Sequence, residues 1–127
     1  MTPLHIAAYK EHKDIVSLLL SNGANIHQAT SDGTTPLYIT CQNGQTDTVS
    51  MLLLKGANVN QAKDNGAAPL HIAAFNKHKD VVALLLANGA NSHQAMIDGA
   101  TPLSIAQKNG HTEIVELLRS QNPIVKG

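Results

Sequence analysis

The stretch Thr2-Pro-Leu-His-Ile-Ala-Ala8 decides the fold, because it returns at a fixed spacing along the chain. Its copies start 33 residues apart and read Thr35-Pro-Leu-Tyr-Ile-Thr-Cys41, Ala68-Pro-Leu-His-Ile-Ala-Ala74 and Thr101-Pro-Leu-Ser-Ile-Ala-Gln107. A second apolar stretch follows every copy, at Asp14 to Leu20, Asp47 to Leu53, Asp80 to Leu86 and Glu113 to Arg119. Self-similarity at a period of about 20 to 50 residues is typical of repeat architectures. The sequence therefore predicts four units of one repeat.

The residues around each copy predict two short helices. Thr35 is a good N-cap, and Pro36 occupies the first helical position, where its missing N–H costs no hydrogen bond. Gly44 supplies a left-handed end to this helix, and Asp47 then places negative charge in the first turn of a second helix. Each unit is thus expected to read turn, helix, turn, helix.

Glycines mark most of the expected turns. Gly-Ala closes the second helix at Gly23, Gly56 and Gly89, and tight turns between the units are expected at Asp32-Gly33, Asn65-Gly66 and Asp98-Gly99. Two units have Glu11 and Lys77 where Gly44 and Gly110 end the first helix. A left-handed backbone at these two residues would carry strain of about 1 kcal/mol.

The repeated stretches resemble the ankyrin repeat, which has this period and a T-P-L-H-x-A signature. The resemblance covers almost the whole chain and implies an all-α solenoid of four stacked helix-turn-helix units, with β-hairpin-like turns between units. We expect one domain over residues 1–127, with repeats at approximately 1–29, 30–62, 63–95 and 96–122 and a tail at 123–127. Neighbouring units must stack, because two short helices cannot enclose a core alone.

Three departures from the family pattern carry expectations. The usual hairpin Asp is replaced by Thr30, Lys63 and Met96, which puts the standard turn hydrogen bonds in doubt. Arg119 replaces an apolar residue of the earlier units, and polar residues follow it at 120–122, as a terminal capping repeat requires. The first unit lacks its preceding turn, so we expect the chain to come from a longer array.

Composition excludes several function classes. Nine Lys and Arg residues balance nine Asp and Glu residues in 127, so the chain lacks the basic surface that binding to nucleic acid needs. No apolar run approaches the ~20 residues that a membrane-spanning helix requires. The single cysteine, Cys41, fits a reducing compartment, so we expect an intracellular and cytoplasmic protein.

No catalytic or metal chemistry is expected. The seven histidines fall on three repeat positions, and we interpret them as structural: His5, His12, His27, His71, His78, His93 and His111. Equivalent residues of successive units lie a full repeat apart, too far for the ~2 Å bonds of a zinc site. Cys41 occupies an alanine position, so we interpret it as a packing residue rather than a nucleophile. We therefore expect neither an enzyme nor a cofactor.

Asparagine hydroxylation, known for ankyrin repeats of animals, is a weak alternative at Asn60, because Asn58 stands where the family pattern has Asp.

The resemblance implies a protein partner, held by the turn tips and the first helices along a concave surface. Residues at these positions vary while the framework repeats, as expected of a recognition surface. The candidates are Tyr9, Lys10, Ser31, Asp32, Thr34, Gln42, Asn43, Asp64, Asn65, Phe75, Asn76, Met96, Ile97, Asp98, Lys108 and Asn109. Phe75, Met96 and Ile97 are the three main expected apolar anchors, and Tyr9 is a further candidate.

The alternative is a structural spacer of a longer array that self-associates weakly through its first repeat; otherwise the chain is expected to be a monomer.

Overall fold

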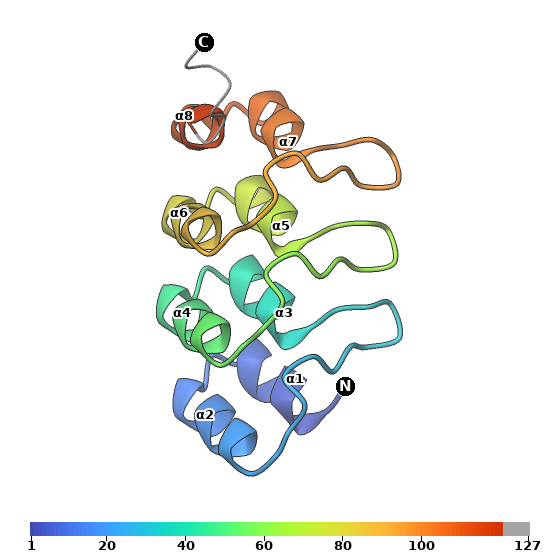
Figure 1. The fold of residues 1–127 in the computed structure, drawn as a ribbon, viewed down its shortest axis with the longest axis vertical. Helices are drawn as coiled ribbons and strands as arrows, with labels where there is room; N and C mark the ends of the chain where they lie inside the picture. The colour runs from blue at the N-terminus through green and yellow to red at the C-terminus, as the bar shows by residue number, and fades with distance from the viewer. Residues whose placement is uncertain (121–127) are drawn as a thin grey trace.

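The computed structural model describes residues 1–120, which form eight helices and no strand. The shorter first helix of each unit is α1 (Pro3–Tyr9), α3 (Pro36–Gln42), α5 (Pro69–Phe75) or α7 (Pro102–Lys108). The second helix is α2 (Lys13–Ser21), α4 (Thr46–Leu54), α6 (Lys79–Ala87) or α8 (Thr112–Ser120). Figure 1 shows the four helix pairs stacked along the long axis, with hairpin loops projecting on one side. The predicted all-α solenoid of four units is confirmed.

The first helices begin as the Thr-Pro pattern predicts. Thr2, Thr35 and Thr101 each accept a hydrogen bond at the side-chain oxygen from the third helical N–H. The third unit has Ala68 instead, whose own N–H donates to Nδ1 of His71 at 3.0 Å. The second helices carry no side-chain cap at the three starts that the structure defines, but each has an acidic residue in its first turn. The positive end of the helix dipole, at the N-terminus, stabilises these carboxylates.

The turn after each first helix is left-handed at one residue. Gly44 and Gly110 have φ angles of 72° and 71°, and Glu11 and Lys77 both have a φ of 63°. Glu11 and Lys77 thus adopt the left-handed backbone whose strain was considered from the sequence. Each carries the steric cost that its Cβ meets in this region.

The hairpins between units are closed by main-chain hydrogen bonds. The N–H of Thr30 donates to the carbonyl of Thr34 at 2.9 Å. The N–H groups of Lys63 and Met96 likewise donate to the carbonyls of Ala67 and Ala100. Neighbouring hairpins are joined as well, since Asp64 N–H donates to the Asp32 carbonyl at 3.0 Å. The hairpins therefore form a ladder along one edge of the solenoid.

The replaced hairpin residues do not prevent turn hydrogen bonds. Oδ1 of Asn65 accepts from the Ala67 N–H, and Oδ1 of Asp98 accepts from the Ala100 N–H, both at 3.0 Å. In the first hairpin the Thr34 N–H donates to Oδ1 of Asp32 at 3.3 Å and also to the Thr30 hydroxyl at 3.1 Å. The side chain two residues into each turn thus stabilises it, whatever stands at the position of the usual Asp.

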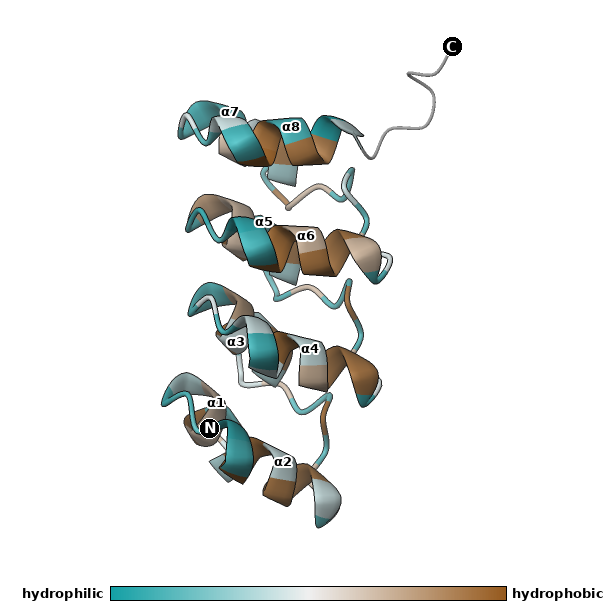
Figure 2. Cartoon of the chain, turned by 90° about the vertical axis from the view of Figure 1, so that its left-hand side faces the viewer, coloured by the Kyte–Doolittle hydropathy of each residue, from teal (hydrophilic) through white to brown (hydrophobic). Residues whose placement is uncertain are grey.

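The core lies between two layers of helices. The inner layer holds α1, α3, α5 and α7, the outer layer holds α2, α4, α6 and α8, and each helix contacts its pair and its neighbours in the stack. Leucine, valine and alanine fill this space, as in Leu37, Leu70 and Val82. Figure 2, which views the outer layer, shows hydrophobic and hydrophilic residues mixed along each of its helices. No helix within residues 1–120 is long and apolar enough to span a bilayer.

The expected C-terminal cap can be followed only in part. Arg119 is exposed in α8, as a polar outer face requires. The expectations for residues 121–127 lie outside the described residues.

Candidate functional site

The candidate residues fall in two rows, one on the hairpins and one at the C-terminal ends of the first helices and in the turns that follow. The hairpin row contains the exposed residues Ser31, Asp32, Asp64, Asn65, Ile97 and Asp98, together with the half-buried Thr34 and Met96. The helix-end row contains the exposed residues Tyr9, Lys10, Gln42, Phe75, Lys108 and Asn109, together with the half-buried Asn43 and Asn76. We call the surface between these rows the inner face.

Two candidates in the helix-end row are engaged within the stack. Nδ2 of Asn43 donates to the Tyr9 carbonyl, and Nδ2 of Asn76 donates to the Gln42 carbonyl, both at 3.1 Å. Each bond reaches the preceding unit. These amides therefore join neighbouring first helices, and only their remaining polar atoms can serve a partner.

A groove of about 140 Å³ lies on the inner face and is lined by residues of the second, third and fourth units. Its apolar lining comes from Tyr38, Ile72, Phe75, Met96 and Ile105. Phe75 is 54% exposed at the end of α5, and Met96 is half-buried in the last hairpin. The groove therefore brings two of the three expected apolar anchors together.

The third anchor, Ile97, stands outside the groove lining and is 80% exposed at the hairpin tip. It carries the most exposed large hydrophobic side chain of the inner face.

Five residues of the groove lining are not among the candidates from the sequence: Tyr38, Ala67, His71, Ile72 and Ile105. Ile72 and Ile105 belong to the repeated Thr-Pro-Leu motif and share a position with Ile39, which is buried. Tyr38 stands in the histidine position of the motif. The tyrosine in place of histidine was the one available signal, because the isoleucines look alike in every unit.

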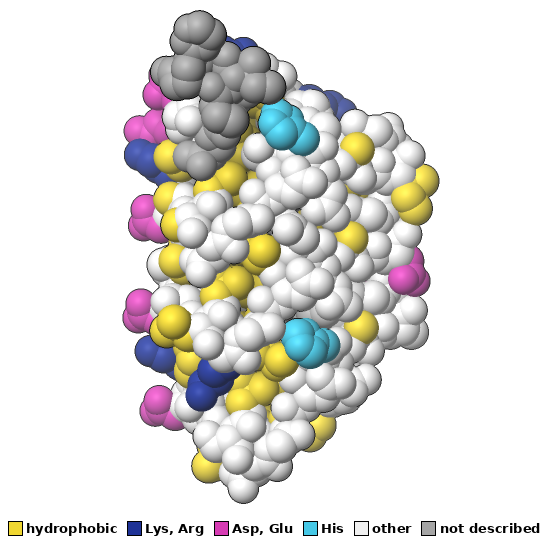
Figure 3. All heavy atoms as spheres, in the orientation of Figure 1, with side chains coloured by type: hydrophobic (Ala, Val, Ile, Leu, Met, Phe, Trp, Pro, Cys, Tyr) yellow, Lys and Arg dark blue, Asp and Glu magenta, His cyan; other side chains and the backbone are white. Residues whose placement is uncertain are grey.

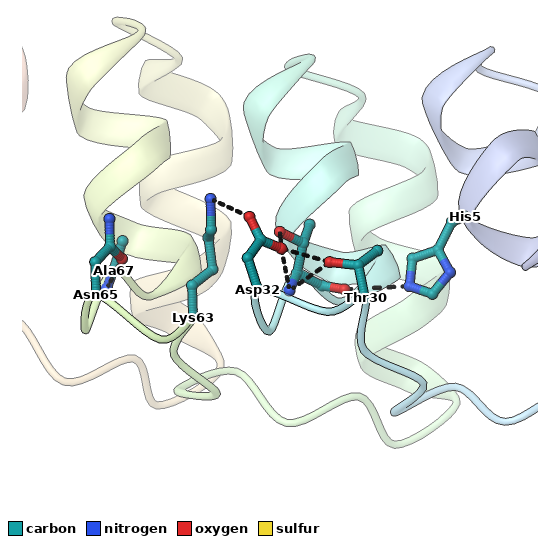
Figure 4. A network of polar contacts seen from close by, with 7 residues as sticks. His5, Thr30, Asp32, Lys63, Asn65 and Ala67 are labelled. Atoms are coloured by element: carbon teal, nitrogen blue, oxygen red, sulfur yellow. Dashed lines mark hydrogen bonds and ion pairs between the residues drawn. The ribbon is translucent and has the colours of Figure 1, made fainter. Parts of the chain in front are cut away.

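A charged contact supports the hairpin row beside this groove. Lys63 Nζ lies 3.3 Å from Asp32 Oδ2 of the preceding hairpin (Figure 4). The same Nζ lies 5.0 Å from the centroid of the Tyr38 ring. A cation at this distance is attracted to the face of an aromatic ring. Lys63 thus connects two hairpins and a first helix, and its charge is met by that of Asp32.

The same network sets two pKa values. Hydrogen bonds from the Thr30 and Thr34 hydroxyls hold the pKa of Asp32 well below its usual range, and the charge of Lys63 adds to this effect. Burial raises the pKa of Tyr38, and the Asp32 carboxylate raises it further. Asp32 is therefore ionised and Tyr38 is neutral at physiological pH.

The motif histidines join successive units. Nδ1 of His71 accepts the Ala68 N–H, so the proton lies on Nε2, which donates to the Gln94 carbonyl at 2.9 Å and the Ala100 carbonyl at 3.3 Å. His5 makes the equivalent contact, from Nε2 to the Thr34 carbonyl at 3.1 Å. Both rings are buried, and each holds the base of the next hairpin against its own helix.

A second polar ladder was not anticipated from the sequence. The residue before each of the helices α4, α6 and α8 reaches back to the first helix of the preceding unit. Nε2 of Gln45 donates to the Ala8 carbonyl at 2.9 Å, and Nδ1 of His111 donates to the Ala74 carbonyl at 2.9 Å. His78 makes the corresponding bond to the Gln42 carbonyl at 3.0 Å. These bonds give His78 and His111, two of the turn histidines, a structural role.

Among residues 1–120, no group of three or more His, Cys, Asp or Glu side chains could hold a metal ion. Burial raises the pKa of the Cys41 thiol far above its usual value, so the thiolate that a nucleophile needs is not formed at neutral pH.

Asn60 is engaged between units: its Oδ1 accepts the Asn91 N–H at 2.8 Å and its Nδ2 donates to the Gly89 carbonyl at 3.3 Å.

Comparisons with known proteins agree with the stacked geometry. A family model described as ankyrin repeats (3 copies) matches residues 1–63 and again residues 53–126. A search of curated proteins gives no match.

Proposed function

This chain belongs to the ankyrin repeat family, and we propose that it is a protein-binding module that holds its partner on the inner face. Ankyrin repeats generally mediate interactions between proteins and are generally not catalytic. Because a fold alone does not fix a function, the proposal depends on the chemistry of the face itself.

The groove beside an exposed hairpin tip is the observation that carries the proposal. It combines aromatic, methionine and isoleucine side chains, which are enriched where protein interfaces are most buried. Main-chain and side-chain bonds between units hold the surrounding hairpins, so little conformational freedom is lost when a partner binds. A partly exposed apolar groove on a rigid support favours recognition of another protein.

The buried and protonated Cys41 supports a non-catalytic role within this proposal. A lone buried cysteine also suits a reducing compartment, and we place the protein in the cytoplasm on this ground.

Capture from a lysate of the source organism tests the proposal. The parent chain is compared with an Asp64→Lys/Ile97→Asp double variant whose circular dichroism and melting temperature are unchanged. Both residues are exposed on hairpin tips, so the substitutions should leave the fold intact. Proteins retained by the parent and lost by the variant support the inner face. Equal retention by both chains shows that partners bind elsewhere.

A second candidate function is self-association through the first unit. Ile15 and Leu18 in α2 are 46% and 61% exposed, whereas Val81 and Ile114, which share the repeat position of Ile15, are buried. Apolar side chains that neighbouring units cover elsewhere are open on this end of the solenoid. A spacer segment would use this end to pack against another repeat.

Sedimentation analysis at high micromolar concentration separates the two candidates. A dimer that dissociates in a Leu18→Asp variant supports self-association. If the parent chain and the variant are both monomers, strong self-association is excluded, and the protein-binding module is the function that stands.

A further inference from the structure

We propose that the groove accepts a large apolar side chain of a partner segment that also carries a lysine or arginine directed toward the hairpin tips. This inference rests on the proposed function and specifies the chemistry of the partner. It is argued from the size of the groove, from its lining and from the charges beside it.

The groove fits one large apolar side chain. Its volume is about 140 Å³, and an apolar cavity of roughly 150 Å³ accommodates a benzene ring. The Tyr38 ring, Ile72 and Ile105 come from the three first helices α3, α5 and α7, and Met96 comes from the last hairpin. A leucine, methionine or phenylalanine side chain of the partner would contact apolar carbon atoms of several of these lining residues.

The hairpin row beside the groove carries uncompensated negative charge. Among residues 1–120, the ion pairs are those of Lys63 with Asp32 and of Lys79 with Glu113, so neither involves Asp64 or Asp98. Because Asp32 meets the charge of Lys63, the two exposed carboxylates of Asp64 and Asp98 remain. Figure 3 shows acidic and hydrophobic side chains together on the hairpin edge.

Both carboxylates lie on hairpins that also carry groove residues. Asp64 and Asn65 are neighbours in one hairpin, and Asn65 lines the groove, while Oδ1 of Asp64 lies over Gly33 of the preceding hairpin. Oδ1 of Asp98 accepts the Ala100 N–H, which fixes the carboxylate over its turn. Burial lowers the pKa of His71, a groove residue, and the nearby Asp98 carboxylate is among the groups that oppose this shift.

The side of the groove away from the hairpins carries positive charge and so disfavours a basic residue of the partner. Lys108 is exposed at the end of α7, at the same repeat position as Phe75. A basic residue of the partner would be repelled there and attracted to the hairpin side. The charges thus orient the bound segment as well as select it.

Methyl NMR with defined peptides tests the inference. The probes are Gly-Ser peptides with a central Lys-Phe-Lys, Glu-Phe-Glu or Lys-Gly-Lys. The signals are the Cδ1 methyl groups of Ile72 and Ile105 and the Cε methyl of Met96, and the Ile6 methyl is a reference outside the groove. We expect Lys-Phe-Lys to shift the three groove methyls saturably, and Lys-Gly-Lys to bind at least tenfold more weakly.

Two charge variants give the matched comparison. Asp64→Asn/Asp98→Asn removes the exposed carboxylates of the two hairpins that carry groove residues. Asp47→Asn/Asp80→Asn removes two exposed carboxylates from helix starts in the outer layer. The first variant should weaken Lys-Phe-Lys binding about fivefold, the size expected for two exposed charge pairs. The second variant should leave the affinity unchanged, and added salt should weaken binding to the parent.

The peptide results distinguish a failure of the inferred charge preference from a failure of the inferred partner chemistry as a whole. If Glu-Phe-Glu shifts the groove methyls as strongly as Lys-Phe-Lys, the inference about charge is overturned while the groove remains a protein-binding site. If no peptide shifts these methyls, the partner chemistry is overturned. The proposed function is then decided separately by the capture experiment with Asp64→Lys/Ile97→Asp.

Discussion

Gly66 packs directly against Met96 of the next hairpin. A Cβ atom at position 66 would lie 2.9 Å from the Met96 Cα and 2.9 Å from the Ile97 nitrogen. Gly66 also has a φ of 88°, in the left-handed region. Two separate requirements, backbone conformation and close approach, therefore meet at this glycine. The hairpins can hydrogen-bond to each other because the side chain is absent.

Gly66→Ala is expected to destabilise the protein more than Gly99→Ala does. Gly99 has nearly the same φ, 90°, but a Cβ there would meet no atom within 4 Å. Gly99→Ala should therefore cost about 1 kcal/mol from backbone strain alone, and Gly66→Ala about 2 to 4 kcal/mol because the hairpins must also move apart. Urea unfolding of the two variants measures the difference. An equal loss of unfolding free energy in the two variants would mean that the hairpins can move apart without destabilising the protein.

Lys77→Gly is expected to stabilise the protein by about 1 kcal/mol. Lys77 is exposed and has a φ of 63°, where glycine meets no Cβ penalty. Thermal unfolding should show a higher melting temperature for the variant.

Gly44→Ala is the reverse control for this turn, because a Cβ at Gly44 would lie 2.7 Å from the His78 ring. It should lower the melting temperature. A lower melting temperature for Lys77→Gly would show that flexibility in the unfolded chain outweighs the strain in the fold.

The His71 ring is expected to titrate below the usual histidine pKa of about 6.5. Burial lowers its pKa by disfavouring the charged ring, although the Gln94 and Ala100 carbonyls and the Asp98 carboxylate favour that form. Since the unfolded chain binds the proton more readily, the stability that the neutral ring provides is complete above pH ~6.5. It is lost as the pH falls from there through the folded pKa. NMR titration of the ring carbons measures this value and should show the Nε2–H form; a folded pKa above 6.5 would reverse the sign.

The repeating framework could be predicted because its signals are local. A Thr-Pro pair such as Thr35 and Pro36 starts the first helix in three of the four units. Comparison with Gly44 and Gly110 pointed to the turn positions of Glu11 and Lys77 as possible left-handed residues. These features depend on residues within one unit. The period then extended each inference to the other units.

The groove could be predicted only in part because it depends on how units stack. Phe75 and Met96 were identified as apolar residues at variable positions, and they line the groove. Ile72 and Ile105 were not identified, because the equivalent Ile39 is buried and the sequence does not show which member of a repeated position is exposed. The bond from His111 to the Ala74 carbonyl was missed for the same reason, since it joins residues 37 positions apart.

Site-specific photocrosslinking tests the central claim, that partners bind the inner face, most directly. A photoreactive residue replaces Ile97 at the last hairpin tip in one protein and Leu54 at the end of α4 in another. Both positions hold exposed aliphatic side chains, 80% and 86% exposed, but they lie in the hairpin row and the outer helix layer. In a lysate of the source organism, we predict crosslinked protein partners at position 97 that are absent at position 54. Partners crosslinked at position 54 and not at position 97 would contradict binding through the inner face.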